Sequence, residues 1–196
     1  MKKYAIFGSG GHAKEIASVM QIDCVFIVDE EYKTKDNLTL KDISPKEYQI
    51  LIGLGDSKLR EKIANKIQHF EFFTYIHPTA IISKGSTIGK GSYIGPYCII
   101  TNNVSIGEHS LLSRVSQIGH DSVCGNFLSM MPGSIVSGNC KIGNNNYIGN
   151  NSAIKEKVET ENDVFLGMNS CAVKNITESG IYVGCPCRRI KNYDLP

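Results

Sequence analysis

The chain has 196 residues, of which 41% are hydrophobic and 20% are charged. These values suit one large or two small globular domains with modest cores, and they argue against a mainly disordered chain. The formal net charge of +2 at pH 7 gives no electrostatic reason to expect binding to nucleic acid or to an acidic membrane surface.

The N-terminal sequence has no apolar region long enough for a signal peptide, and no apolar run reaches the roughly 20 residues of a membrane helix. We therefore expect a cytoplasmic protein. Its seven cysteines are scattered, and no Cys-x-x-Cys pair or Cys/His spacing indicates a zinc site. We expect buried free thiols and no metal, while redox or metal chemistry stays open for Cys185 and Cys187.

Residues 1–75 alternate short apolar runs with helical patterns. Strands are predicted at 3–7, 24–28, 49–52 and 70–75. Two helices are predicted from apolar residues at helical spacing: Ala13, Ile16, Ala17 and Met20 in the first, and Leu59, Ile63 and Ile67 in the second. Asp56 or Ser57 can cap the second helix. Strands that alternate with helices imply a small parallel sheet with crossover helices.

The rest of the chain repeats every six residues. Of the sixteen residues at this spacing from 82 to 172, thirteen are Ile, Leu, Met or Val, and the next residue is Gly in eight repeats. This period fits a parallel β-helix with three rungs per coil, in which one aliphatic side chain per rung points into a triangular core and Gly helps the chain to turn each corner. Sixteen rungs make about five coils, stacked at roughly 4.8 Å per coil.

Residues 8–13 read Gly-Ser-Gly-Gly-His-Ala between the first strand and the first helix, and Asp29 ends the next strand. This matches the dinucleotide fingerprint, so a nicotinamide-dependent enzyme stays open. However, the first part offers only about half of a classical dinucleotide fold. A nucleotide-linked sugar diphosphate would suit the same glycine turn and helix N-terminus, and a purely structural turn is a third possibility.

Several motifs resemble the NeuD/PglD-type sugar acetyltransferases, in the family's order and over nearly the whole chain. They are the opening Gly-Ser-Gly-Gly-His at 8–12, Gly-Leu-Gly-Asp at 53–56 with Arg60 on the following helix, Ile-His-Pro-Thr-Ala at 76–80, Gly-His-Asp at 119–121, and the tail Gly-Cys-Pro-Cys-Arg-Arg-Ile at 184–190. One departure is Ser129, which stands where the family commonly carries a second histidine.

The resemblance implies two domains: a Rossmann-like nucleotide-sugar-binding domain at 1–75, and a left-handed β-helix acetyltransferase domain with a C-terminal tail at 76–196. It also implies a homotrimer with active sites between adjacent subunits. The implied reaction moves an acetyl group from acetyl-CoA to the 4-amino group of a nucleotide-activated amino-deoxysugar, for surface or glycoprotein glycans. The alternatives are O-acetylation of sialic acid and, outside enzymes, a β-helix scaffold or binding trimer.

His120 is the expected general base, because its ordinary pKa near 6.5 suits proton transfer at neutral pH and the resemblance places the catalytic histidine here. Asp121 is expected to orient the His120 ring, although side chains of neighbouring residues meet only at a bent corner. A scaffold would not need this pair. His109, at a similar position in the repeat, is the rival base.

The substrate sites are also expected from the motifs. The nucleotide sugar is expected to contact Gly8, Ser9, Gly10, Gly11, His12, Asp29, Glu30, Gly53, Gly55 and Arg60. Acetyl-CoA is expected to contact Gly138, Gly149, Gly167, Arg188 and Arg189. Among these, the Gly138 N–H is the expected donor to the thioester oxygen, and the two arginines are expected to meet CoA phosphates.

Overall fold

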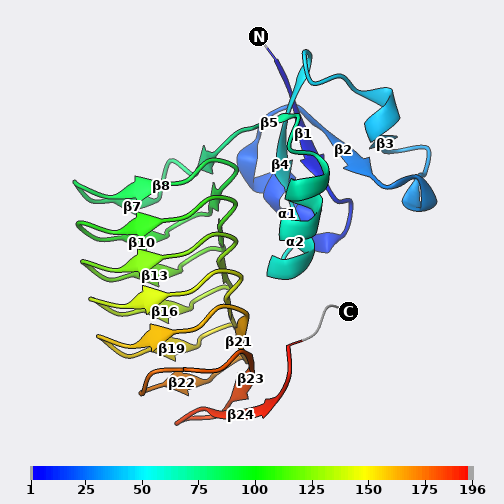
Figure 1. The fold of residues 1–196 in the computed structure, drawn as a ribbon. Helices are drawn as coiled ribbons and strands as arrows, with labels where there is room; N and C mark the ends of the chain where they lie inside the picture. Colours follow the sequence, from blue (N-terminus) through cyan, green and yellow to red (C-terminus); the bar gives the residue numbers. More distant parts are fainter. Residues whose placement is uncertain (1, 194–196) are drawn as a thin grey trace.

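The computed structural model describes residues 2–193 as two packed parts, an α/β part and a tall stack of coils (Figure 1). The α/β part contains β1 Lys3–Phe7, α1 Gly11–Met20, β2 Cys24–Val28, the 3₁₀ turn Glu30–Tyr32, β3 Leu38–Thr39, the 3₁₀ turn Leu40–Asp42, β4 Tyr48–Ile52, α2 Ser57–Lys66 and β5 Glu71–Phe72. Its five strands are parallel in the order β3-β2-β1-β4-β5. The predicted Rossmann-like sheet is confirmed.

Both predicted helices form where the apolar spacing placed them. In α1 the buried side chains are Ala13, Ile16 and Met20. Asp56 is the N-cap of α2, and its carboxylate accepts a 2.8 Å hydrogen bond from the Leu59 N–H. β3 was not predicted, because a strand of two residues has no periodicity to detect.

The predicted strand at 70–75 is wrong, because this segment contributes to two different sheets. β5 pairs with β4, whereas β6 Tyr75–Ile76 pairs with β9 Tyr93–Ile94 of the first coil. Phe73 is buried between the two strands, in a cluster that contains Tyr93. A continuous apolar run can therefore cross from one sheet to another without a visible break.

The coils form a β-helix, as the six-residue period predicted. Every predicted core position ends one short strand: β7 Ile81–Ile82, β8 Thr87–Ile88, β9 Tyr93–Ile94, β10 Ile99–Ile100, β11 Ser105–Ile106, β12 Leu111–Leu112, β13 Gln117–Ile118, β14 Val123–Cys124, β15 Ser129–Met130, β16 Ile135–Val136, β17 Lys141–Ile142, β18 Tyr147–Ile148, β19 Ala153–Ile154, β20 Glu159–Thr160, β21 Val164–Leu166 and β22 Cys171–Ala172. These strands stack into three parallel sheets that enclose one apolar core.

The corners correct one prediction about glycine. From Ile82 to Leu166, the residue three positions after each core residue has positive φ, as at Asn103 (φ 59°) and Asp121 (φ 57°), whereas the glycines directly after the core residues do not. These glycines serve close packing instead. A Cβ on Gly149 would lie 2.6 Å from the backbone nitrogen of Met168 in the next coil. The glycines thus allow coils to stack, and other residues turn the corners.

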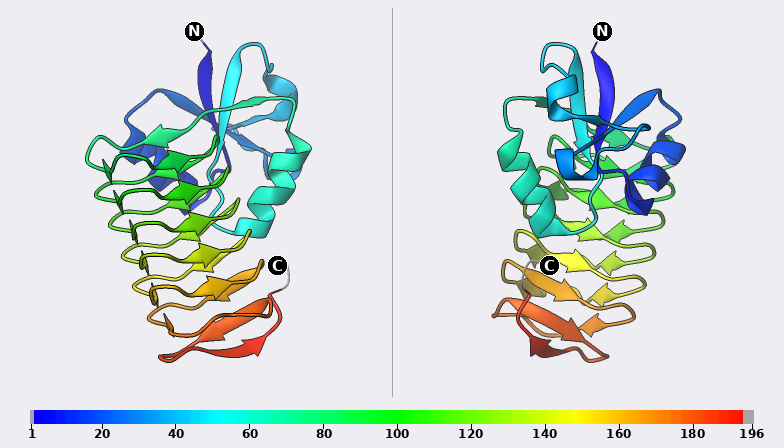
Figure 2. Two further views of the ribbon diagram at one scale, coloured as in Figure 1. Left: turned by 60° about the vertical axis from the view of Figure 1, so that its left-hand side comes forward. Right: turned by 90° about the vertical axis from the view of Figure 1, so that its right-hand side faces the viewer.

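The C-terminal end closes the stack with a hairpin and then returns toward the α/β part. β23 Gly180–Val183 pairs with β21, and antiparallel β24 Arg188–Lys191 completes the hairpin. Beyond it, the Tyr193 hydroxyl donates a 3.0 Å hydrogen bond to the Asp56 carboxylate. In Figure 2 the red segment beyond β24 turns back in the direction of the α/β part.

The α/β part covers the outer face of the eight-stranded sheet, where Tyr93 and Leu111 pack in one cluster with residues of β1 and α1. Arg60 of α2 is fully buried at this junction. Its guanidinium donates to the carbonyls of Leu54 (2.6 Å), His109 (2.7 Å), Phe127 (2.8 Å) and Leu128 (3.1 Å), and to Ser129 Oγ (2.9 Å). Arg60 therefore ties the two parts together.

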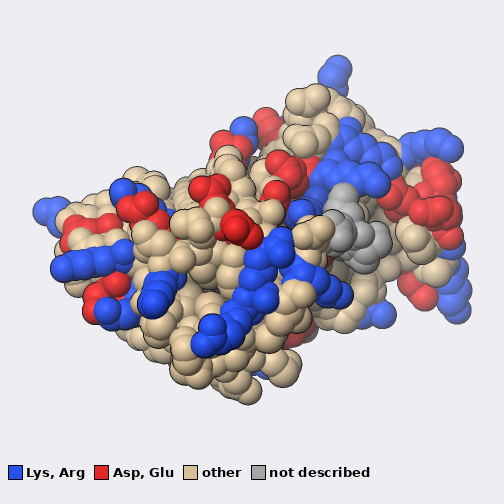
Figure 3. All heavy atoms as spheres, turned by 60° about the horizontal axis from the view of Figure 1, so that its bottom comes forward, with Lys and Arg blue, Asp and Glu red and all other residues tan. Residues whose placement is uncertain are grey.

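The surface charges and the lengths of the helices complete the description of the fold. Basic and acidic side chains are interspersed over the face of the molecule that Figure 3 shows. Neither helix within residues 2–193 has the length and apolar character needed to cross a membrane.

Candidate active site

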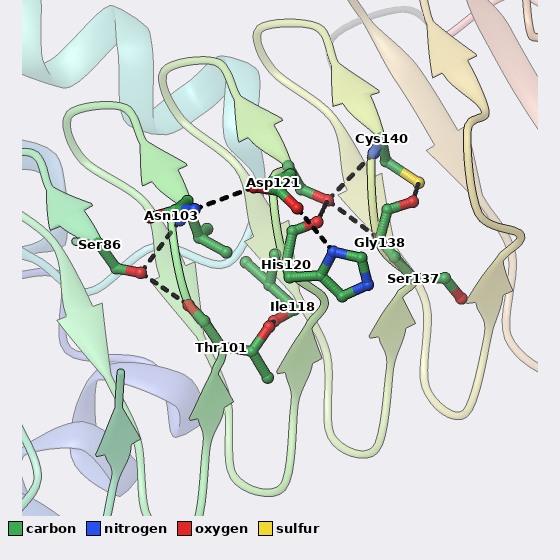
Figure 4. Close-up of polar contacts among 11 residues, drawn as sticks. Ser86, Thr101, Asn103, Ile118, His120, Asp121, Ser137, Gly138 and Cys140 are labelled. Carbon is green, nitrogen blue, oxygen red and sulfur yellow. Dashed lines mark hydrogen bonds and ion pairs between the residues drawn. The ribbon is translucent and has the colours of Figure 1, made fainter. Parts of the chain in front are cut away.

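His120 and Asp121 lie together at a corner between the six-stranded and five-stranded sheets, between β13 and β14 (Figure 4). The ring nitrogen Nδ1 of His120 lies 2.8 Å from Oδ2 of Asp121. Two neighbouring side chains can meet here because the positive φ of Asp121 bends the chain. The carboxylate holds the proton on Nδ1, so Nε2 is left as the acceptor for a substrate proton.

Asn103 holds the other oxygen of Asp121. Its Nδ2 donates a 3.1 Å hydrogen bond to Asp121 Oδ1 from the corner of the preceding coil. The hydrogen bonds from His120 and then from Asn103 lower the pKa of Asp121, which keeps this carboxyl ionised. Asn103 was not among the residues predicted for the site. The signal was available, because Asn103 precedes Asp121 by one full coil in the repeat.

Gly138 lies next to the His120 ring, one coil further along (Figure 4). A Cβ at Gly138 would lie 2.8 Å from Nε2 and 3.0 Å from Cε1 of His120. Any larger residue would therefore displace the ring from its present position. The His120 side chain is 55% exposed, so a reacting group could approach Nε2 close to the Gly138 backbone.

The other residues expected to bind acetyl-CoA lie elsewhere in the chain. Gly149 and Gly167 follow strands of the eight-stranded sheet, at a different corner from His120. Arg188 and Arg189 belong to β24, and the Arg189 guanidinium donates to the Ser179 carbonyl and to the Asn192 side chain. Within one chain, the structure brings only Gly138 next to His120.

His109, the rival base, is enclosed at the junction of the two parts. It is only 4% exposed and stacks against Phe127, with the edge of Phe72 on its other side. Burial, with the nearby charges of Arg60 and Lys90, lowers its pKa to about 4. A nearly buried histidine with so low a pKa is a weak base at neutral pH, so His120 remains the base candidate.

A separate cavity of about 750 Å³ lies at the carboxyl ends of β1 and β2. Its lining residues are Phe7, Gly8, Ser9, Gly10, Val28, Asp29, Glu31, Tyr32, Leu54, Leu59, Lys62, Ile63 and Lys66. In this sheet order, the crevice beside β1 is the place where nucleotides bind in doubly wound folds. Gly8 has φ 111°, and a Cβ there would lie 3.0 Å from Leu54 Cδ2. The glycine turn thus keeps the cavity open.

Four of the expected nucleotide-sugar residues line this cavity, namely Gly8, Ser9, Gly10 and Asp29. Gly11, His12, Glu30, Gly53, Gly55 and Arg60 do not. His12 faces the junction with Tyr93 and Arg114 instead, and its burial lowers its pKa. Gly53 serves packing, since a Cβ there would lie 2.7 Å from Ile6 Cγ2.

Arg60 was expected to contact the nucleotide sugar, and the structure places it elsewhere. Its donors are occupied by carbonyls and by Ser129 at the junction, so the side chain is not available to a ligand. Ser129 itself also donates to the Gly55 carbonyl at 2.7 Å. The residue that stands in place of the family's second histidine is therefore buried beneath the α/β part.

Two family models match the chain. The PglD N-terminal domain matches residues 3–67, and the GMPPB C-terminal domain matches residues 72–183, which is more than half of the chain. The chain belongs to the PglD-type sugar N-acetyltransferases. Proteins of this type use acetyl-CoA to acetylate a sugar amine, so the chain is an acetyltransferase.

Among PglD-type relatives, the chain is similar to the GDP-perosamine N-acetyltransferase of Escherichia coli O157:H7. The two are 28% identical over 178 residues, which cover 81% of this chain and 80% of that protein. The fold is similar to the acetyltransferase domain of PglB from Neisseria gonorrhoeae FA1090 in complex with acetyl coenzyme A (TM-score 0.87, 22% identity, covering 96% of this chain and 99% of that one). It is also similar to PerB from Caulobacter crescentus in complex with CoA and GDP-perosamine (TM-score 0.88, 20% identity, covering 97% and 98%).

Proposed function

We propose that this acetyltransferase moves an acetyl group from acetyl-CoA to the 4-amino group of a nucleotide-activated amino-deoxysugar, in the synthesis of surface or glycoprotein glycans. The observation that carries the proposal is the His120–Asp121 pair, which leaves Nε2 of the partly exposed His120 ring next to Gly138. The similarity to a GDP-perosamine N-acetyltransferase over most of both chains supports an amine as the acceptor.

The chemistry follows from these residues. His120 Nε2 accepts a proton as the sugar nitrogen attacks the thioester carbonyl, and Asp121 stabilises the resulting imidazolium. The Gly138 N–H donates to the oxygen that becomes negative in the tetrahedral intermediate. Collapse of the intermediate breaks the carbon–sulfur bond, and His120 returns its proton to the CoA thiolate. The products are the sugar amide and CoA.

The two substrates would use different parts of the chain. The nucleotide sugar binds the 1–75 domain in the cavity beside Gly8, Ser9, Gly10 and Asp29. Acetyl-CoA runs along the 76–196 domain, with Gly149 and Gly167 at a groove and Arg188 and Arg189 near its phosphates. Because both substrates are metabolites of the cytoplasm, we propose that the protein works there.

The active site would lie between subunits of a homotrimer. In one chain, the α/β part covers the eight-stranded sheet, whereas His120 lies at the corner between the other two sheets. Ile81 and Ile135 are exposed on the six-stranded sheet, which gives a neighbouring copy an apolar surface to cover. A neighbour could then bring its nucleotide cavity to this chain's His120.

The test is release of CoA thiol from acetyl-CoA with a panel of acceptors: UDP-, GDP- and dTDP-linked 4-amino-deoxysugars, free sialic acid and CMP-linked sialic acid. Mass spectrometry then locates the acetyl group. We expect fast turnover with one 4-amino sugar nucleotide and acetylation of its amine. Turnover on sialic acid alone would move the acceptor to a hydroxyl, and no turnover on any acceptor would contradict the proposal.

A further inference from the structure

Helix α2 forms one wall of the nucleotide cavity. Leu59, Lys62, Ile63 and Lys66 all line the cavity, and their spacing of three and four residues places them on one face of the helix. Lys62 and Lys66 are the basic residues among those that line the cavity. The opposite wall is the turn Gly8–Ser9–Gly10, which leads into the N-terminus of α1.

Lys66 is already engaged across the cavity. Its Nζ lies 2.5 Å from Oδ1 of Asp29 at the end of β2, and both side chains are partly exposed. Lys62 forms no ion pair within the described residues, so its charge is unshared in the cavity wall. The Asp29–Lys66 pair is exposed enough to be broken at small cost, because ion pairs of this kind contribute little to stability.

We propose that Lys62 and Lys66 hold the diphosphate of the nucleotide sugar, and that Lys66 exchanges Asp29 for this diphosphate when the ligand binds. The proposal rests on the proposed function and deepens it. It gives two lysines of α2 the ligand-binding role that was expected for Arg60, whose donors are occupied at the junction of the two parts. The freed Asp29 carboxylate can then accept a hydrogen bond from a ribose hydroxyl.

The exchange gives Lys66 a new anionic partner in place of Asp29. In the free chain, Lys66 is neutralised by Asp29. In the complex, the two ammonium groups face the two negative charges of the diphosphate, together with the N–H groups of the glycine turn and the positive end of α1. Tyr32 also lines the cavity and is 65% exposed, so its ring is free to stack on the base.

The test measures binding of UDP, GDP, dTDP and CMP by titration calorimetry. Variants Lys62→Gln and Lys66→Gln each remove one charge, and Lys46→Gln serves as the matched control because Lys46 is exposed and does not line the cavity. For the nucleoside diphosphate that the native protein binds best, we expect each cavity variant to weaken binding about tenfold or more, since hydrogen bonds to charged groups are strong. The control should bind as the native protein does. Thermal melting checks that every variant is folded.

Asp29→Asn tests the exchange itself. This variant releases Lys66 but removes the carboxylate that would meet the ribose. We expect it to bind inorganic pyrophosphate more tightly than the native protein and to lose part of its preference for the nucleoside diphosphate over pyrophosphate. If pyrophosphate binding is unchanged in Asp29→Asn, the exchange is overturned.

Failure of this inference is distinct from failure of the proposed function. If Lys62→Gln and Lys66→Gln bind nucleoside diphosphates and acetylate the sugar with native KM, the lysine role is wrong and the reaction stands. If the native protein binds no nucleotide of the set, the inference is also overturned. If the lysines are required for nucleotide binding but no acceptor is acetylated, the inference stands and the function fails.

Discussion

At the scale of single residues, His120 is held on one side only. Asp121 and Asn103 fix the ring through Nδ1, while Nε2 faces the space beside Gly138. This difference between the two ring nitrogens suits a base that must accept a proton on Nε2 and give it back. A histidine that merely filled a corner would not need a carboxylate on one nitrogen and open space at the other.

His120→Ala should lower kcat by about two to four orders of magnitude, because general-base catalysis contributes that much. The exposed ring makes few packing contacts, so melting temperature and oligomeric state should not change. His69→Ala is the control, since His69 is exposed and belongs to the α/β part, between α2 and β5. Steady-state kinetics with acetyl-CoA and the best acceptor measure the effect; near-native turnover in His120→Ala would refute its role as base.

His109 should make stability depend on pH. Its folded pKa is about 4, whereas the unfolded chain has the ordinary value near 6.5. Between these values the unfolded chain binds a proton that the folded chain excludes, so the free energy of unfolding should fall as pH drops from 6.5 to 4. Burial of neutral His109 therefore contributes its full effect above pH 6.5.

Urea denaturation at pH 7 and at pH 5 measures this dependence. His109→Gln should flatten the decrease, although buried His12 adds a similar contribution of its own. His69→Gln should keep the native slope. An unchanged slope in His109→Gln would mean that other groups cause the acid sensitivity.

At the scale of elements, the coil is shaped by close approach between successive turns. Glycines after the core residues allow neighbouring coils to touch backbone to backbone, and residues such as Asn103 and Asp121 supply the positive φ. Asparagine and aspartate tolerate this conformation better than most residues. The two requirements fall at different positions of the six-residue repeat, and at the positive-φ position glycines such as Gly85 and Gly133 occur beside asparagine and aspartate.

Gly143→Ala should destabilise the β-helix by about 1–3 kcal/mol, as overpacking does. A Cβ at Gly143 would lie 2.5 Å from the carbonyl oxygen and 2.6 Å from the carbonyl carbon of Glu161 in the next coil, and this backbone cannot easily move. Gly11→Ala is the control, since nothing lies within 4 Å of a Cβ there. Chemical denaturation compares the two; equal stabilities would show that the coils can separate at no cost.

At the scale of the whole molecule, the two halves of the proposed site lie on different sides of the prism. The α/β part with its nucleotide cavity is fixed to the eight-stranded sheet by Arg60, and Tyr193 returns to Asp56 at the same junction. His120 lies at the opposite corner. In the proposed homotrimer, a second copy of the chain would supply the nucleotide cavity to this His120.

Mixing two inactive variants should restore activity if subunits share the site. His120→Ala removes the base, and Gly10→Glu places a carboxylate in the cavity where the diphosphate would lie, at a position with free space around a Cβ. After unfolding and refolding together, random trimers should regain up to about a quarter of native activity, because that share of interfaces carries both intact halves. Each variant refolded alone is the control. No recovery in the mixture would contradict a site shared between subunits.

The sequence by itself determined the features that recur at a local period. The core positions from 82 to 172 mark the rungs because each rung places one small or aliphatic side chain inside, and this need repeats whatever the rest of the chain does. Short local patterns likewise predicted the strands at 3–7 and 24–28, the cap at Asp56 and the glycine turn. The His120–Asp121 pair was predictable as a motif.

Tertiary structure decided what depends on residues distant in the chain. Arg60 reads as a solvent-exposed helix residue or a phosphate ligand, yet folding places it against carbonyls more than forty residues away. The same packing places His12 and His109 at the junction of the two parts, and leaves Lys62 and Lys66 lining the nucleotide cavity. A side chain's partners across a junction follow from how two parts dock, and docking has no period in the sequence.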